Sequence, residues 1–191
     1  MDKFKVKGET YHMPECWDDV DIKTYKKIID TFNRSKDKGD TSIIIDVISE
    51  LTGMPNKDIY YLDVDTFNAM ASTLNFVGTD IPDRDVEFIT INGEKYGFKN
   101  QYEKLNVGEM ISIEQMIKNS DNVSIEVDKV IAVIMRKVND DGTLADFNSD
   151  LVDEYIKLIQ DIKITDVYKL CIFFFDIVRI YINNSMASSN Q

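Results

Sequence analysis

Residues 86–99 read VEFITINGEKYGFK, and this stretch is the most clearly specified structural element of the sequence. Asparagine followed by glycine, here Asn92 and Gly93, readily adopts the positive φ angles that a two-residue hairpin turn requires. On the strand that follows the turn, Tyr96 and Phe98 occupy every second position, as expected for one face of a strand. The pattern therefore predicts a two-stranded antiparallel hairpin at about residues 86–99.

Helical patterns surround this hairpin on both sides. Apolar residues recur at helical spacing in seven segments, which are residues 22–32, 41–51, 65–74, 107–117, 123–138, 152–162 and 167–182. In the first segment the apolar stripe is Ile22, Tyr25, Ile29 and Phe32. Residues that begin or end helices accompany several of them. Asp18, Asp19 and Asp21 mark the start of the first, Gly53 follows the second, and Asp65 or Thr66 is expected to open the third. Asn106 is a candidate cap for the fourth segment, and Thr165 or Asp166 for the last.

These patterns predict an α+β fold class, namely a predominantly helical single domain over residues 1–191 with a hairpin at about residues 86–99. Residues 1–13 are expected to be a flexible or strand-like arm, because Phe4 and Val6 alternate with lysines. Residues 185–191 read as a polar tail.

The chain is strongly acidic. It has 22 basic and 34 acidic residues, which gives a formal net charge of −12. Such a field repels phosphate backbones, so we expect no nucleic-acid partner, whether bound sequence-independently or sequence-specifically. The acidity is also compatible with a protein that is simply kept soluble, with a DNA mimic, or with a protein that lives beside DNA without binding it.

The sequence predicts neither a membrane-spanning segment nor a set of disulfide bonds. The longest apolar run, residues 170–175, ends at Asp176 and is far shorter than the roughly 20 residues that span a bilayer. Cys16 and Cys171 lie far apart in the sequence and do not form a disulfide framework. The N-terminal 13 residues show no secretory pattern, so we expect synthesis in a reducing cytoplasm.

The residue types needed for a metal site or a catalytic triad are sparse. His12 and Cys16 are four residues apart, but a structural zinc site needs four ligands and only Cys171 could be added. A single histidine also leaves little room for Ser-His-Asp or Cys-His catalysis. The sequence contains no glycine-rich phosphate loop. We therefore expect no metal, no cofactor and no catalytic site.

The strongest enzymatic alternative is a metal-dependent nuclease. Asp83 follows a proline and precedes the hairpin that carries Glu94 and Lys95, an order similar to the Pro-Asp…(Asp/Glu)-x-Lys motif of such enzymes. However, Glu94 and Lys95 are adjacent, and adjacent side chains of a strand point to opposite faces. These two residues would not share a metal, and we predict that the chain is not an enzyme.

Aromatic residues provide the candidate interface. The helix expected over residues 167–182 is apolar nearly all round, so it is either central to the core or docked on a partner, and we expect a mixture of the two. The hairpin is the second element on which we place an interface. The candidate interface residues are Phe173, Phe175, Tyr181, Tyr96 and Phe98.

Several segments, in this order, resemble small proteins from the head–tail gene block of tailed phages, particularly the crAss-like phages of gut Bacteroidales. The segments are MPECWDDVDIKTYKKIID at 13–30, LTGMPNKDIYYL at 51–62, ITINGEKYGFKNQYEKLNVGEMISIEQMI at 89–117 and KVIAVIMRKV at 129–138. The shared pattern is an entry helix after a Pro-x-x-Trp stretch, a helix ending in LTG, the Asn-Gly hairpin and a Gly-Glu helix.

This resemblance implies a virion-associated or morphogenetic role. We expect a non-enzymatic virion component, either a portal- or tail-proximal ring protein or a packaged cargo protein, made in the host cytoplasm and located in the virion. Its partners would be portal, ring or tail subunits in a multi-copy assembly. One alternative is a tail-assembly chaperone that is missing from the mature particle. A further alternative is an acidic DNA mimic that inhibits a host enzyme.

Overall fold

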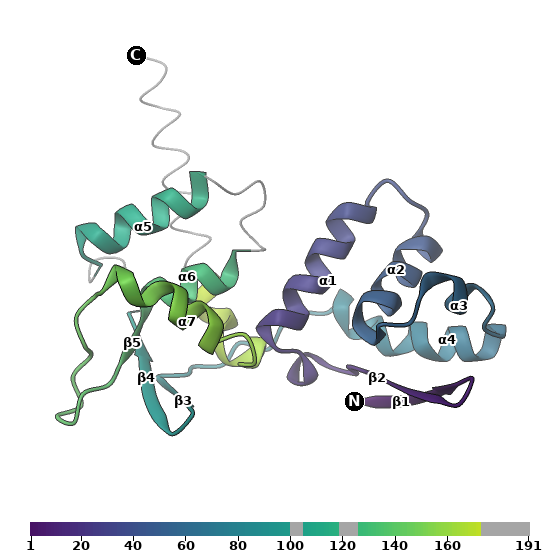
Figure 1. Ribbon diagram of the computed structural model, residues 1–191, viewed down its shortest axis with the longest axis horizontal. Coiled ribbons are helices and arrows are strands. Elements are labelled where there is room, and N and C mark those ends of the chain that lie inside the picture. Colours follow the sequence, from purple (N-terminus) through teal and green to yellow (C-terminus); the bar gives the residue numbers. More distant parts are fainter. Residues whose placement is uncertain (100–104, 119–125, 173–191) are drawn as a thin grey trace, which may run out of the picture. The chain divides into compact units, whose positions relative to one another are not determined.

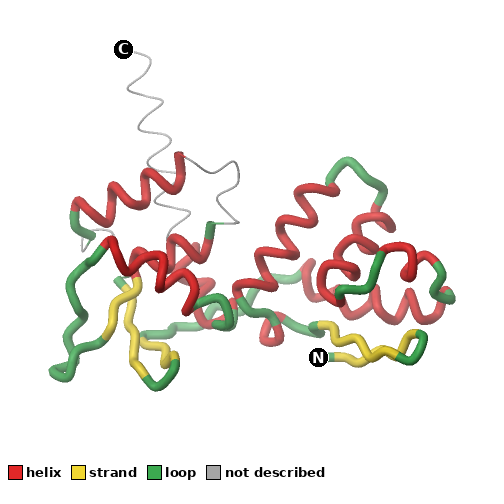
Figure 2. Tube along the Cα trace, in the orientation of Figure 1, coloured by secondary structure: helices red, strands yellow, loops and turns green. Residues whose placement is uncertain are grey.

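The computed structural model describes residues 1–99, 105–118 and 126–172 (Figure 1). Helices predominate in these residues, together with a two-stranded and a three-stranded antiparallel sheet, so the predicted mostly helical α+β fold is confirmed (Figure 2). The chain divides into two compact units. Unit 1 comprises Met1–Pro82 with Lys163–Thr165, and unit 2 comprises the described residues of Asp83–Ile162 and Asp166–Gln191. A single domain over residues 1–191 stays a prediction.

Unit 1 is a helical cluster with a β-hairpin at its N-terminal end. Its elements are β1 (Asp2–Val6), β2 (Glu9–Met13), the 3₁₀ turn η1 (Trp17–Asp19), α1 (Ile22–Ser35), α2 (Asp40–Thr52), α3 (Asn56–Tyr60), α4 (Val64–Thr73) and the 3₁₀ turn η2 (Leu74–Gly78). The strand-like pattern of residues 1–13 is realised as β1 and β2, which pair from Asp2 opposite Met13 to Val6 opposite Glu9.

The core of unit 1 joins this hairpin to the helices. Its buried members are Val6, Met13, Ile45, Ile48, Met54, Ile59 and Met70. Beside this cluster, the buried indole of Trp17 meets Phe76 edge-to-face, with ring centroids 5.0 Å apart. The indole N–H of Trp17 donates to the carbonyl oxygen of Thr79 at 3.1 Å, which satisfies the one polar atom of that ring.

Short side chains define the helix ends in unit 1. The carboxylate of Asp21 accepts the backbone N–H of Thr24 at 2.7 Å, as expected for the cap of α1. The third helix begins earlier than the sequence predicts, because Asp63 accepts both the N–H and the hydroxyl of Thr66 at 2.8 Å. Asp63 is therefore the N-cap of α4, in place of Asp65 or Thr66.

Gly53 ends α2 in a conformation that favours glycine. Its φ angle is +74°, and its N–H donates to the carbonyl oxygen of Ser49 at 2.8 Å. A Cβ atom added at this position would meet open space, so only the backbone conformation resists a side chain. We expect Gly53→Ala to lower the free energy of unfolding by about 1 kcal/mol. Urea denaturation checks this value, and a neutral substitution would show that α2 can end in another way.

Unit 2 places helices beside a three-stranded sheet. Its elements are β3 (Phe88–Ile91), β4 (Glu94–Phe98), α5 (Val107–Lys118), α6 (Val127–Ile134), β5 (Met135–Lys137), the 3₁₀ turn η5 (Ser149–Leu151) and α7 (Val152–Leu158). The predicted hairpin is confirmed, with φ angles of +53° at Asn92 and +83° at Gly93 and with Ile91 opposite Glu94.

The segment 123–138 departs from its predicted continuous helix. Residues 123–125 lie outside the described residues, α6 ends at Ile134, and residues 135–137 form a strand. This strand, β5, pairs with β4 so that Tyr96 lies opposite Lys137 and Phe98 opposite Met135. The N–H and C=O groups on the second edge of β4 are satisfied in this way, and β4 becomes the central strand of the sheet.

The last predicted helix is described only in part. Residues 164–172 are helical, so the helix begins before Thr165 or Asp166 could cap it. Thr165 is fully buried, and its hydroxyl has no hydrogen-bond partner among the described residues. Residues 173–182 and the polar tail 185–191 lie outside the described residues.

Candidate interaction site

Three large apolar side chains are exposed where α3 meets α4. Tyr60 is 64% exposed, Tyr61 83% and Val64 72%. They lie within five residues of the chain, at the end of α3 and the start of α4 (Figure 1). We call Tyr60, Tyr61 and Val64 the tyrosine patch. Single exposed apolar residues are ordinary, but a local group of this size is typical of an interaction surface.

The residues between and beside the patch fix this corner to the core of unit 1. Ile59 is buried in the core, and Leu62 packs against it. Asp58 pairs with Lys7 of the turn between β1 and β2, with 2.8 Å between Nζ and Oδ1. Asn56 donates through its side-chain amide to Asp46 of α2 at 2.9 Å. The segment that carries the patch is therefore fixed by three sets of contacts: with the core, with Lys7 and with Asp46.

Tyrosine is well suited to contact chemistry. Its ring supplies a large apolar surface with few rotatable bonds, and its hydroxyl donates or accepts a hydrogen bond at the rim. The sequence analysis placed no interface on Tyr60 or Tyr61. Their exposure is a feature of the tertiary structure, in which Ile59 is the one buried residue of the five-residue helix α3. The two residues that follow Ile59 are directed outwards.

Unit 2 contains a buried ion pair that the sequence analysis also did not single out. Glu109 of α5 is fully buried, and Arg136 of β5 is 2% exposed. A guanidinium nitrogen of Arg136 donates to Oε1 of Glu109, and the other terminal nitrogen donates to the carbonyl oxygens of Val133 and Met135 at 2.7 and 2.6 Å. The guanidinium also lies 4.8 Å from the ring centroid of Phe147.

Glu109 links this pair to the start of α5. Its Oε2 accepts the backbone N–H of Asn106 at 2.6 Å, while Oδ1 of Asn106 accepts the N–H of Glu109 at 3.0 Å. This reciprocal capping box confirms Asn106 as the cap. Nζ of Lys99 lies 3.0 Å from Oε1 of the same carboxylate. Burial lowers the pKa of Arg136, while the adjacent negative charge of Glu109 acts to raise it.

The role of these two residues is structural, because their ion pair joins α5 to β5 within unit 2. Glu109 joins the start of α5 to the strand that carries Arg136. Two signals in the sequence pointed to them. One is the spacing of Asn106 and Glu109, and the other is a lone arginine at the end of the apolar run 130–135.

The predicted interface residues of the hairpin lie in the interior of unit 2. Tyr96 and Phe98 are both buried. The ring of Tyr96 meets that of Tyr155 edge-to-face at 5.8 Å, and burial raises the pKa of its hydroxyl. The unpredicted strand β5 and helix α7 belong to the same unit and leave neither ring for a partner. The other candidates, Phe173, Phe175 and Tyr181, lie outside the described residues.

The residues of the nuclease alternative make separate contacts. Glu94 pairs with Lys137 of β5 at 2.7 Å, whereas Nζ of Lys95 lies 3.8 Å from the ring centroid of Phe88. Asp83 lies 3.9 Å from Nζ of Lys169 on the helical segment 164–172. The structure therefore does not bring Glu94 and Lys95 onto one partner. That the chain is not an enzyme stays a prediction.

The two cysteines differ in exposure. Cys16 is exposed, whereas Cys171 is buried. The thiol of Cys171 donates to the carbonyl oxygen of Val167, with 3.3 Å between Sγ and O. Burial raises the pKa of the Cys171 thiol to about 12. Within residues 1–99, 105–118 and 126–172, no group of three or more His, Cys, Asp or Glu residues is placed to hold a metal ion.

We expect only Cys16 to react rapidly with an aromatic disulfide reagent in the folded protein. The Cys171 thiol is buried and protonated at neutral pH, and the thiolate is the reactive form. Absorbance of the released thiolate measures the reaction, with and without guanidinium chloride. Cys16→Ser serves as the matched variant and should remove the rapid phase. Equal rates for the two thiols in the folded protein would contradict the burial of Cys171.

Comparisons with protein-family models, with curated proteins and with solved structures found no match for this chain. Among the residues that the structure describes, none of the helices is long and apolar enough to cross a membrane.

Proposed function

We propose that this chain is a non-enzymatic structural component of a tailed-phage particle that works through contacts with portal, ring or tail subunits. The tyrosine patch carries the proposal, because Tyr60, Tyr61 and Val64 hold a large apolar surface in water on a well-anchored corner. The resemblance of four segments to proteins of phage head–tail gene blocks supplies the setting. The protein would be made in the host cytoplasm and located in the virion in several copies.

Covering the patch would provide the energy for such a contact. Transfer of one large apolar side chain from water to a buried site is worth about 1.5–3 kcal/mol. Tyrosine is among the residues that contribute most to protein interfaces, because its binding energy comes with little loss of side-chain freedom. Tyr60 and Tyr61 together are therefore sufficient for the centre of a small interface.

The charge of the chain favours a position near packaged DNA but not bound to it. A net charge of −12 repels the DNA backbone over about a Debye length, roughly 8–10 Å at physiological salt. This property suits a ring or cargo protein beside the path of the DNA. A tail-assembly chaperone would use the same exposed patch, but it would leave before the particle is complete.

Mass spectrometry of purified virions tests the proposal. We expect peptides of this chain in a stoichiometric ratio to portal or tail subunits. A lysate of infected cells, loaded at equal total protein, is the control for expression. Peptides in the lysate together with none in virions would contradict a virion component and would favour the chaperone alternative.

A variant of the tyrosine patch tests whether the patch is the surface through which the chain is incorporated into virions. We expect Tyr60→Ser with Tyr61→Ser to lower incorporation into virions by at least tenfold while the melting temperature stays within about 2 °C, since both side chains are exposed. The matched control is Lys36→Ser with Asp37→Ser, two adjacent exposed residues of the same unit. Unchanged incorporation of the tyrosine variant would show that the patch is not the contact.

A further inference from the structure

We propose that the groove between α5 and α7 binds a basic, apolar-faced segment of a partner protein. This inference rests on the proposed function, since it assumes that the chain works through protein contacts, and it adds a second contact with a partner of defined chemistry. The groove lies entirely within unit 2 and is separate from the tyrosine patch of unit 1.

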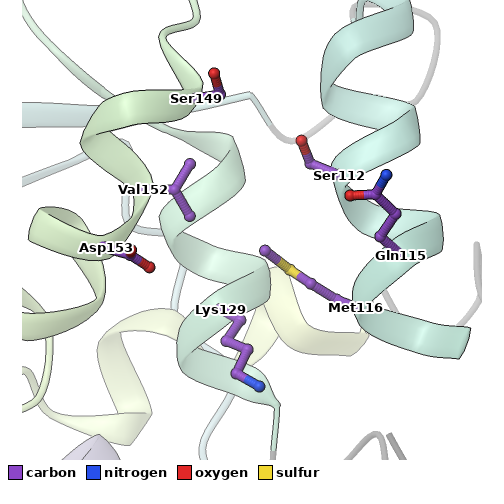
Figure 3. A pocket seen from close by; sticks show the side chains of 7 residues that line it. All are labelled: Ser112, Gln115, Met116, Lys129, Ser149, Val152 and Asp153. Atoms are coloured by element: carbon purple, nitrogen blue, oxygen red, sulfur yellow. The ribbon is translucent and has the colours of Figure 1, made fainter. Parts of the chain in front are cut away.

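The groove is a hollow of about 340 Å³ over α6, with α5 and α7 as its two walls (Figure 3). Met116 of α5 and Val152 of α7 project towards each other across it and provide an apolar centre. Ser112 and Gln115 line it from α5, and Asp153 lines it from α7. These side chains combine an apolar centre with polar edges, which is the usual composition of a protein-binding surface.

The shape suits a segment of protein chain better than a small molecule. Small-molecule sites enclose most of the ligand surface, whereas this hollow is largely open and is lined by residues of two facing helices. The twelve residues of α5 give a wall of about 18 Å at 1.5 Å per residue, which matches three turns of a docked helix. Binding of an amphipathic helix in a groove between helices is a common recognition mode.

Charge identifies the partner chemistry. Between Lys137 and Lys157 the sequence contains no basic residue. The same stretch contains six exposed carboxylates, which are Asp140, Asp141, Asp146, Asp150, Asp153 and Glu154. The only basic side chain lining the groove in the described residues is Lys129, and its Nζ is paired with Oε2 of Glu126 at 2.6 Å. Of these six, Asp153 lines the groove, and Asp150 and Glu154 are sequence neighbours of the lining residues Ser149 and Asp153. The α7 wall of the groove is therefore acidic and complementary to lysine or arginine.

Binding of a probe peptide to the full-length chain tests the inference. The probe is an amphipathic peptide of about 16 residues, with leucines at helical spacing on one face and lysines on the other. Two matched peptides replace either all lysines by glutamate or all leucines by serine. By fluorescence anisotropy we expect the leucine–lysine peptide to bind at least tenfold more tightly than either of them. If either matched peptide bound as tightly as the leucine–lysine peptide, or if that peptide did not bind at all, the inference would be overturned.

Variants then place the binding on the groove. We expect Asp150→Lys with Asp153→Lys to weaken binding at least tenfold and Met116→Gln to weaken it severalfold. The matched control, Asp37→Lys with Asp80→Lys, changes the net charge equally at exposed positions of unit 1 and should alter binding less than twofold. If the double groove variant unfolds, Asp153→Asn takes its place. Equal loss in groove and control variants would mean that only the total charge attracts the peptide.

The outcomes separate this inference from the proposed function. If the chain is abundant in virions but does not bind the probe, the groove inference is wrong and the proposed function stands. If the chain binds the probe through Asp153 but is missing from virions, the proposed virion role is wrong and the groove inference stands. If the wild-type chain self-associates and Met116→Gln makes it monomeric in sedimentation, the occupant is a second copy and the basic partner is wrong.

Discussion

Replacing Arg136 by methionine is expected to lower the free energy of unfolding of unit 2 by about 3–5 kcal/mol. The substitution leaves the carboxylate of Glu109 buried without its guanidinium partner. The loss should lie towards the lower value, because Nζ of Lys99 remains 3.0 Å from Glu109 and can balance part of the charge. Urea denaturation monitored by circular dichroism measures the change.

The neighbouring residue provides the matched control. Lys137 pairs with Glu94 across the sheet at 2.7 Å, but both side chains are about half exposed. Lys137→Met is expected to lower the free energy of unfolding far less than Arg136→Met, because water already screens an exposed pair. In the double variant Arg136→Met with Glu109→Gln, the buried charge is removed and we expect at least half of the loss to be recovered. Equal losses for Arg136→Met and Lys137→Met would show that the Glu109–Arg136 pair is not buried.

Truncating Ile48 in the core of unit 1 is expected to have the second large effect. Ile48→Ala should lower the free energy of unfolding by about 2–5 kcal/mol, because a fully buried side chain loses its transfer energy and leaves a cavity. Ile48 lies in α2 and belongs to the cluster that also contains Met13 of β2 and Met70 of α4. The midpoint of urea denaturation should therefore fall while its slope stays constant.

Val64→Ala is the control within the same unit. Val64 belongs to the tyrosine patch and is largely exposed, so its truncation should change the free energy of unfolding by less than about 0.5 kcal/mol. This comparison also separates folding from function, because a patch that serves a partner can be altered without unfolding the chain. A loss for Val64→Ala as large as that for Ile48→Ala would mean that the patch is part of the core.

The elements that the sequence predicts well are those fixed by neighbouring residues. The Asn92–Gly93 turn, the Asp21 cap and the Gly53 helix end each depend on chemistry within about four residues, and each is found in the structure. Strand β5 could not be predicted in this way. Its residues continue the apolar run of α6, and their strand conformation depends on pairing with β4, about 40 residues earlier in the chain.

Buried faces were predicted less accurately than helix positions. In α1 Ile22 and Ile28 are fully buried, whereas the sequence stripe included Ile29, which is only partly buried. Phe32, a member of the same stripe, is 39% exposed. Adjacent apolar residues satisfy helical periodicity equally well, so spacing alone does not choose between them. The inner face is decided by the elements that pack against the helix.

The candidate site was missed for a related reason. Counting aromatic residues directs attention to the cluster at residues 173–175 and to the hairpin, whereas exposure depends on what covers each ring. Tyr96 is covered by its own unit, and Tyr60 and Tyr61 are not. Only the tertiary structure distinguishes Tyr96 from Tyr60 and Tyr61, because residue type and spacing do not say what covers a ring.

Hydroxyl-radical footprinting of Tyr60 and Tyr61 tests most directly whether the chain works through this contact surface. The oxidation of both rings is measured by mass spectrometry in the purified chain and in intact particles that contain it, with exposed Met1 as the internal reference. We expect rapid oxidation of both tyrosines in the purified chain and at least fivefold protection in the particle. Equal oxidation in the two samples would contradict the claim that a partner covers the tyrosine patch.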